Sequence, residues 1–266
     1  MPPDGATRLA APDPVPTLAR MSPPATVAWD RYRAVLLDLD GVITPTAEIH
    51  ERAWAQLFAA HQFTSADYLA YIDGKNRYEG VRSFLESRGV DLPYGDPSDP
   101  PGDDTICALG NRKNVLFNEI VASGPVEPYP GTMAVLDLLD RQGTLQAVVS
   151  SSRNARSVLD AAGMGDRFEV IVDGVVAADE GLASKPAPDG FLLAADRLGV
   201  APAEAVVVED AVAGVEAGVA GHFGFVVGVD RGGNAEALAR AGAHQVVADL
   251  SETLTDAEVD ADRGRI

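Results

Sequence analysis

The chain has 266 residues, of which 46% are hydrophobic, so it can bury one large core or two modest ones. It carries 40 acidic and 21 basic residues, and a surface with a formal net charge of −19 repels nucleic acid. No apolar run approaches the roughly 18 residues of a membrane span, and the Pro-rich start lacks the order of a signal peptide. We therefore expect a cytoplasmic protein without membrane contact.

Residues 1–29 hold seven prolines and little apolar periodicity, so we expect a disordered tail there and a second flexible tail over residues 256–266. The first expected strand is the apolar run that begins at Ala34. It ends just before Asp38 and Asp40. Ligands of open α/β sheets bind beyond the carboxyl ends of strands, so these two aspartates are candidate site residues.

A mostly helical stretch separates this strand from the others. Apolar residues recur with helical spacing over three segments, residues 47–60, 78–88 and 105–122. Between the last two, DLPYGDPSDPPGDD (91–104) is typical of a loop. We therefore expect a helical cap domain over residues 46–127, inserted into a core domain made of residues 30–45 and 128–255.

The rest of the core alternates helices with short apolar strands. Three strands are expected, at residues 146–150, 205–209 and 225–229. This βαβ pattern predicts an α/β fold with a Rossmann-like parallel sheet flanked by helices.

A run of serines follows the expected strand that ends near residue 150. Ser150, Ser151 and Ser152 are followed by Asn154, which begins a helix. Hydroxyls and free backbone N–H groups at such a place can bind an anion. Taken alone, the run fits an ordinary loop or helix cap equally well.

Two other segments add charge at the same edge of the predicted sheet. Lys185 precedes a Pro-led helix, and Glu209 and Asp210 end another strand. Singly, the lysine fits a surface charge and the acids fit a charge pair at a helix start. Together with Asp38, Asp40 and Ser150, these residues place four carboxylates, a hydroxyl and a lysine at one edge of the predicted sheet. Chance placement explains such a grouping poorly.

This set of residues fits phosphoryl transfer through an aspartyl-phosphate. Asp38 would attack phosphorus once a divalent ion offsets the repulsion between carboxylate and phosphate. Oxygen ligands from Asp38, the Asp40 backbone carbonyl and Asp210, with Glu209 as a further candidate, suit Mg²⁺. Asp40 would act as general acid for the leaving oxygen and then as general base.

The phosphate itself needs positive charge and close backbone. Lys185 and the Ser150 hydroxyl would hold the oxygens of the transferring phosphate, and Gly41 lets the backbone turn close to it. Because so acidic a chain repels a phosphorylated substrate, the site must gather its few cations locally or recruit a metal ion.

Four segments match, in order and spacing, the four motifs of the haloacid dehalogenase superfamily: DLDGVIT, VVSSS, SKPAP and VVVEDAVAGVEAG. The chain resembles that superfamily over about residues 33–230 and is most similar to its β-phosphoglucomutase branch, which carries a helical cap in the first insertion position. The resemblance implies Asp38 as nucleophile, Asp40 as acid/base, and Ser150 and Lys185 as phosphate ligands. It also implies a magnesium site formed by Asp38, Asp40, Glu209 and Asp210.

The resemblance extends to the cap. It implies that Thr46 and His50 couple cap closure to the acid/base aspartate and that Arg77 binds the second phosphate of the substrate. Lys113 and Asn114 match another cap position that faces the core. The alternatives stay open: an ordinary helix histidine at position 50, and surface charges at positions 77 and 113.

Two departures from the mutase pattern concern the hinge and the substrate. Pro45 stands where the close pattern has an aspartate, and residues 67–104 are longer and differ from compact mutase caps. The sugar therefore stays open.

Mutases and phosphatases of this kind share the first half-reaction and differ in whether a sugar hydroxyl or water attacks the aspartyl-phosphate. A mutase needs two phosphate sites, because its bisphosphate intermediate must turn around. Arg77, Lys113 and Asn114 are candidates for the second site. We therefore favour a monomer that converts a small-molecule sugar phosphate, β-glucose 1-phosphate, to glucose 6-phosphate through β-glucose 1,6-bisphosphate. Hydrolysis of a sugar phosphate is the alternative.

Two readings outside this enzyme class are weaker. A signalling receiver domain also phosphorylates an aspartate with Mg²⁺, but it is short, lacks a cap and has its acidic pair early in the chain. A non-catalytic phosphate-binding module is disfavoured because every chemical position is filled.

Overall fold

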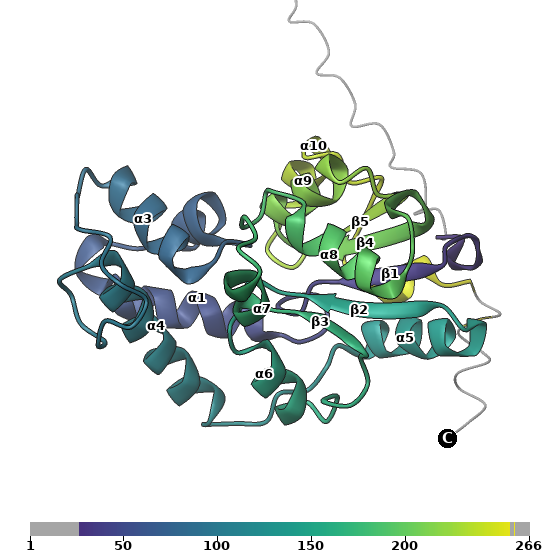
Figure 1. The fold of residues 1–266 in the computed structure, drawn as a ribbon, viewed down its shortest axis with the longest axis horizontal. Coiled ribbons are helices and arrows are strands. Elements are labelled where there is room, and N and C mark those ends of the chain that lie inside the picture. The colour runs from purple at the N-terminus through teal and green to yellow at the C-terminus, as the bar shows by residue number, and fades with distance from the viewer. Residues whose placement is uncertain (1–26, 256–257, 259–266) are drawn as a thin grey trace, which may run out of the picture.

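The computed structural model describes residues 27–255 and 258. Within them a single parallel sheet has the strand order β3-β2-β1-β4-β5-β6. The strands are β1 (Ala34–Leu37), β2 (Leu145–Val149), β3 (Val170–Val172), β4 (Ala205–Glu209), β5 (Phe225–Val229) and β6 (Gln245–Val247). Helices lie on both sides of this sheet (Figure 1), and the predicted α/β fold class is confirmed.

The core helices follow the strands along the chain. They are α5 (Pro130–Gln142), α6 (Ala155–Ala161), α7 (Gly174–Asp179), α8 (Asp189–Leu198), α9 (Val212–Ala220) and α10 (Ala235–Arg240). Short 3-10 turns lie at η1 (Trp29–Arg31), η4 (Pro202–Glu204) and η5 (Leu250–Thr253).

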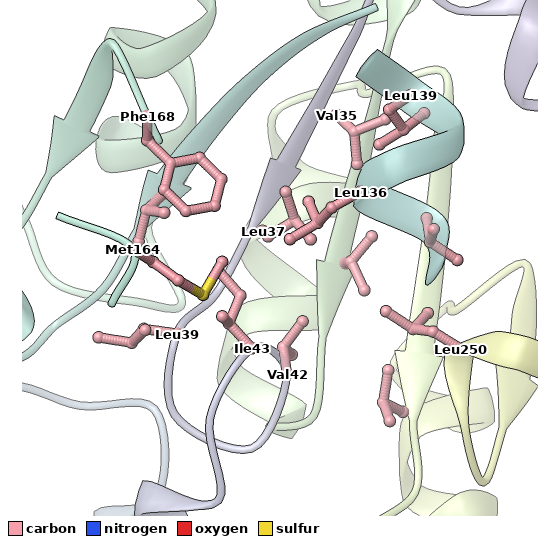
Figure 2. Close-up of a cluster of buried hydrophobic side chains, with 14 of the residues drawn as sticks. Val35, Leu37, Leu39, Val42, Ile43, Leu136, Leu139, Met164, Phe168 and Leu250 are labelled. Atoms are coloured by element: carbon pink, nitrogen blue, oxygen red, sulfur yellow. The ribbon is translucent and has the colours of Figure 1, made fainter. Parts of the chain in front are cut away.

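Alternate residues of β1 point into two separate hydrophobic clusters. Val35 and Leu37 join the cluster that holds residues of α5 and α6, whereas Leu36 joins the cluster that holds residues of α8 and α9. All three are completely buried. Figure 2 shows two residues of α5 in the first cluster, Leu136 beside Leu37 and Leu139 beside Val35. Because both faces of the sheet are covered, the strand is apolar throughout, as is typical of parallel sheets.

The segment between β1 and α5 forms a helical layer beside the carboxyl edge of the sheet, at the left in Figure 1. Its elements are α1 (Thr46–Leu57), η2 (Ala59–His61), α2 (Ser65–Asp67), the π-helix η3 (Tyr68–Ile72), α3 (Arg77–Ser87) and α4 (Ile106–Val121). The three expected helices are therefore confirmed, with ends displaced by a few residues. Residues 91–104 contain no helix or strand, as expected for a loop.

The helical layer has an aromatic cluster of its own. Phe58 and Phe84 lie with ring centroids 4.3 Å apart, and the Trp54 ring stacks on Phe58 at 5.7 Å. Three buried residues of 46–127, Ala53, Phe117 and Val126, instead join the cluster that holds residues of α5 and α6. We propose that residues 46–127 form the cap domain and that these side chains belong to its packing contact with the core.

Two expectations need correction. The tail expected over residues 1–29 is too long, because Val27 and Trp29 are buried and the Val27 amide donates to the Thr253 carbonyl at 3.2 Å. Residues 1–26, 256–257 and 259–266 of the two expected tails lie outside the described residues. In the described part of the chain, no helix combines the length and apolar character that crossing a membrane requires.

Candidate active site

Side chains from three neighbouring strands meet at the carboxyl edge of the sheet. Asp38 directly follows β1, Ser150 directly follows β2, Glu209 is the last residue of β4 and Asp210 comes next. Since these strands are parallel and adjacent, their ends share one edge, as the sequence predicted. A pocket of about 60 Å³ is lined by Asp38, Glu209, Asp210 and residues of the cap.

Lys185 reaches this edge of the sheet by a path that differs from the expected one. It does not follow a strand but lies in the loop between α7 and α8. Its ammonium donates to Asp38 Oδ1 and to Glu209 Oε1, both at 2.5 Å, and to the Val149 carbonyl at 3.2 Å. Burial opposes its charge, but Asp38 and Glu209 outweigh burial and raise the pKa of Lys185. The lysine is therefore charged and fixed beside Asp38.

The carboxylates of the site repel one another in a buried place. Burial raises the pKa of Asp38 well above its ordinary value; Lys185 opposes this, while Glu209 and Asp40 add to it. Burial likewise raises the pKa of Asp210, with Asp73 and Glu209 adding repulsion. One lysine does not offset this repulsion, so the edge attracts a further cation.

The oxygen atoms at the edge fit a magnesium ion that shares its coordination with other ligands. Within the described residues no three His, Cys, Asp or Glu side chains are grouped so as to hold a metal by themselves. Glu209 Oε1 accepts from Lys185 and Oε2 from the Ala211 amide at 2.9 Å, and both oxygens of Asp38 likewise accept hydrogen bonds, from Lys185 and the Asp40 amide. The candidate donors are Asp38, Asp210 and the Asp40 carbonyl, with Glu209 as a further candidate. Mg²⁺ commonly takes one or two carboxylates and completes its shell with water and phosphate oxygens.

Asp40 is held by several donors. Thr46 donates its hydroxyl to Asp40 Oδ1, Ser150 Oγ lies 3.3 Å from Oδ2, and His50 Nε2 lies 3.3 Å from Oδ1. The Asp40 amide donates to Asp38 Oδ2 at 2.8 Å, which fixes the two aspartates relative to each other. Burial would raise the pKa of Asp40, but His50 and Thr46 outweigh burial and lower it to about 2. Asp40 is therefore ionised, the state that a general base requires.

A side-chain path connects Asp40 to the cap. The Lys113 ammonium contacts His50 Nδ1, so Nε2 is the nitrogen that faces Asp40. The His50 ring stacks on Phe117 with centroids 4.1 Å apart, and burial, followed by Lys113, lowers the pKa of His50. Lys113 is 4% exposed, and burial and the Arg77 charge lower its pKa to about 7. Neither residue is an ordinary surface side chain.

A second group of cations lies between cap and core. Arg77 begins α3, lines the same pocket as Asp38, and makes no hydrogen bond or ion pair within the described residues. Arg153, which the sequence reasoning missed, lines with Arg77 an adjoining cavity of about 160 Å³. Burial and then Arg153 lower the pKa of Arg77. Asn154 donates to Asn114 Oδ1 at 2.6 Å, which joins core to cap beside these arginines.

The remaining predicted residues have distinct places. Gly41 adopts φ +86°, and a Cβ there would lie 1.7 Å from Asp210 Oδ2, so only glycine fits. Ser151 donates to the carbonyl of Gly74 in the cap at 2.7 Å, and the Ser152 amide donates to Ser150 Oγ at 3.0 Å. The structure thus brings Gly41 and Ser152 to the core edge, whereas the Ser151 hydroxyl is engaged with the cap.

Asp73 is a further residue that sequence reasoning missed. It comes from the cap, directly after η3, and lines the pocket with Asp210. Burial and the charge of Glu209 raise the pKa of Asp73 to about 7. It lies in no strand-end motif, so no local signal marked it.

Comparison with known proteins places this geometry in a family. The sequence profile of haloacid dehalogenase-like hydrolases matches residues 32–222. The chain belongs to the haloacid dehalogenase-like hydrolase family. It is 45% identical over 243 residues to a β-phosphoglucomutase of Mycobacterium bovis, and the match covers 85% of this chain and 92% of the relative.

Other members of the family extend the comparison. The fructose-1-phosphate phosphatase YqaB of Escherichia coli is 32% identical over 191 residues, which cover 71% of this chain and 92% of that protein. A crystal structure of β-phosphoglucomutase from Clostridium difficile matches with a TM-score of 0.69 at 25% identity and covers 88% of this chain and 97% of that one. The predicted resemblance to the superfamily and its β-phosphoglucomutase branch is confirmed, and the relatives include both mutase and phosphatase.

Proposed function

We propose that this protein is a magnesium-dependent phosphosugar mutase that converts β-glucose 1-phosphate to glucose 6-phosphate through β-glucose 1,6-bisphosphate. One observation carries the proposal: a single pocket is lined by Asp38 and Asp40 at the sheet edge and by Arg77 and Lys113 of the cap. A substrate between them would meet reacting carboxylates and, across the pocket, separate positive charges. The β-phosphoglucomutases among its relatives support the same reading.

The first half-reaction uses the residues around Asp38. A carboxylate oxygen of Asp38 forms a bond to phosphorus while the bond from phosphorus to the sugar or bisphosphate oxygen breaks. The Lys185 ammonium, which lies 2.5 Å from Asp38, and the Ser150 hydroxyl would hold the phosphate oxygens. Mg²⁺, held by Asp38, Asp210 and the Asp40 carbonyl, would offset the repulsion between nucleophile and phosphate.

The second half-reaction uses Asp40. The ionised carboxylate, whose pKa lies at about 2, accepts the proton of the attacking sugar hydroxyl while the aspartyl-phosphate bond breaks. In the reverse direction of this step, when the aspartyl-phosphate forms, the Asp40 carboxyl returns the proton to the leaving oxygen. Thr46 and His50, both on α1, hold this carboxylate, so its alignment depends on where the cap lies.

The second phosphate of the bisphosphate needs its own ligands. Arg77 and Arg153 carry guanidinium groups on opposite sides of the boundary between cap and core. Charge-assisted hydrogen bonds from guanidinium to phosphate are strong and directional. Asn114 and Asn154 lie beside them and would add amide donors. A hydrolase acting on a monophosphate does not need this second set, and for this reason we favour the mutase.

The alternative is hydrolysis of a sugar phosphate, which the phosphatase relative supports. The test is to incubate purified protein with Mg²⁺, β-glucose 1-phosphate and a trace of glucose 1,6-bisphosphate, following glucose 6-phosphate and free phosphate together. Glucose 6-phosphate without matching phosphate supports the mutase. Phosphate alone would overturn it in favour of hydrolysis. Asp38→Asn and metal removal by chelation are the controls, and both should abolish product.

We also propose that the protein is a cytoplasmic monomer and that its partner is a small-molecule sugar phosphate. Sedimentation at assay concentration would test the monomer, and a dimer mass would contradict it. The formal net charge of −19 supports the expectation that nucleic acid is not bound.

A further inference from the structure

The loop that follows β5 lies at the same edge of the sheet as the reacting carboxylates. It runs over residues 230–234, and β5 is the direct neighbour of β4. Asn234 of this loop donates its side-chain amide to the Asp210 carbonyl at 3.1 Å. Arg231, in the same loop, reaches the segment that follows Asp40. The loop therefore contacts both segments that carry the proposed metal ligands, although it carries none itself.

Three successive carbonyls after Asp40 are each held by a donor from elsewhere in the core. Arg231 Nε donates to the Gly41 carbonyl at 2.9 Å. Thr132 Oγ1 donates to the Val42 carbonyl at 2.6 Å, and the Tyr129 amide donates to the Ile43 carbonyl at 2.9 Å. The path from the acid/base aspartate to the cap is thus fixed at consecutive peptide groups.

Arg231 also touches the second connection between core and cap. Residues 122–129 lead from α4 back to α5, and they end at Tyr129. The guanidinium carbon of Arg231 lies 3.7 Å from the centroid of the Tyr129 ring, and its Nη1 donates to the Ala248 carbonyl at 3.0 Å. The side chain is 19% exposed. The guanidinium group of Arg231 therefore contacts both connections of the cap and the residue that follows β6.

We propose that Arg231 is a positioning residue that fixes the pivot on which the cap closes. It acts through the Gly41 carbonyl and the Tyr129 ring, and so sets where Thr46 and His50 meet Asp40. With the pivot fixed, the closed cap excludes water while a sugar hydroxyl attacks the aspartyl-phosphate. This inference rests on the proposed function, because it concerns the share of transfer against hydrolysis.

The test compares Arg231→Gln and Arg231→Lys with the control Arg240→Gln, whose arginine is 74% exposed on α10. The ratio of glucose 6-phosphate to free phosphate is measured for each, beside thermal unfolding. We expect the ratio to fall at least about 10-fold in Arg231→Gln, less in Arg231→Lys, and not in Arg240→Gln. A merely structural role would lower the melting temperature or the active fraction and leave the ratio unchanged, which would overturn the proposal.

Hydrogen exchange of the protein without substrate tests the role of Arg231 independently of the reaction. We expect amides of residues 41–44 and 127–131 to exchange at least about 10-fold faster in Arg231→Gln, while β2 stays as in the unaltered chain. Unchanged exchange in both connections would refute the pivot. Should the unaltered protein form no glucose 6-phosphate, the proposed function fails, and the exchange result still decides the role of Arg231.

Discussion

At the residue scale, the two arginines between cap and core differ in how the sequence presents them. Arg77 comes from a cap motif, whereas Arg153 follows the serine run and received no role from it. Both line the 160 Å³ cavity, and within the described residues neither forms an ion pair with an acid, since Asp173, which lines the same cavity, pairs with Arg156. Two such cations beside one cavity favour an anion there. We therefore propose Arg153, together with Arg77, as a ligand of the second phosphate.

Arg153→Ala tests this assignment. We expect kcat/KM for β-glucose 1-phosphate to fall roughly 10- to 100-fold, since one charge-assisted hydrogen bond contributes about 1.5–3 kcal/mol. Hydrolysis of acetyl phosphate, which has no second phosphate, should change less than about twofold. Arg197→Ala is the control, because that arginine pairs with Glu180 at 3.0 Å and lines neither of the two cavities. Equal losses with both substrates would remove Arg153 from the second phosphate site.

Lys113 gives the protein a pH-dependent stability with a defined sign. Burial lowers its pKa to about 7 in the folded chain, whereas the unfolded chain keeps the proton to about pH 10.4. Between these values the unfolded state binds more protons, so the free energy of unfolding rises with pH in this window. Carboxyl groups whose pKa is raised, such as that of Asp73, change the free energy of unfolding in a lower window, between about pH 4 and 7.

We therefore expect the melting temperature to rise more between pH 7 and pH 10 in the unaltered chain than in Lys113→Met. Lys75→Met, which removes another cap lysine that donates to Tyr71 and Ser83, is the control. Thermal unfolding followed by circular dichroism measures all three. Parallel pH profiles for the unaltered chain and Lys113→Met would show that Lys113 keeps its proton when buried.

Most of the site could be predicted because its members follow strands. That rule found Asp38, Ser150 and Asp210, and applied to residues 225–229 it would also have found Arg231. Lys185 was found from its motif, although its place after a helix was not expected. Asp73 could not be found, because a cap residue reaches the sheet edge only through tertiary packing.

At the element scale, long periodic segments were predicted well and short ones were not. The ends of α1, α3 and α4 fall within a few residues of the expected helices, because each has an apolar face of several turns. The strands β3 and β6 are three residues long and were missed, since so short an apolar run carries no periodicity. Val27 and Trp29 were assigned to the tail by composition, which does not reveal a tertiary contact.

The aromatic cluster of the cap allows a test of the proposed domain division. Phe84 is completely buried between Phe58 and Phe63, so Phe84→Ala should cost about 3–5 kcal/mol. In a Trp29→Phe background, Trp54 fluorescence reports the cap during urea unfolding, and far-ultraviolet circular dichroism reports the whole chain.

We expect the fluorescence midpoint to move more than the dichroism midpoint. Leu69→Ala, at a residue that is 39% exposed, should move neither by much. Identical shifts of both midpoints in Phe84→Ala would mean that cap and core unfold as one unit.

At the scale of the whole molecule, the main feature is the large negative net charge. A formal net charge of −19 makes the compact state repel itself, so salt should stabilise it. We expect the melting temperature to rise by several degrees between about 0.01 M and 1 M NaCl, as the Debye length falls from about 30 Å to 3 Å. A triple variant, Glu119→Gln, Glu169→Gln and Glu216→Gln, removes three exposed charges and should gain less from salt. A melting temperature that falls with salt would show that surface ion pairs outweigh the repulsion.

The two connections of the cap leave the core as neighbours, since the Tyr129 amide bonds to the Ile43 carbonyl at 2.9 Å. An inserted segment whose ends touch can be lengthened, shortened or replaced without moving the strands on which it stands. On the roles proposed above, the segment that would contact the sugar can therefore be exchanged as one unit while Asp38, Lys185 and the other carboxylates keep their positions. If the cap of a phosphatase relative is grafted between these two ends, we expect the hybrid protein to take on the substrate preference of that relative.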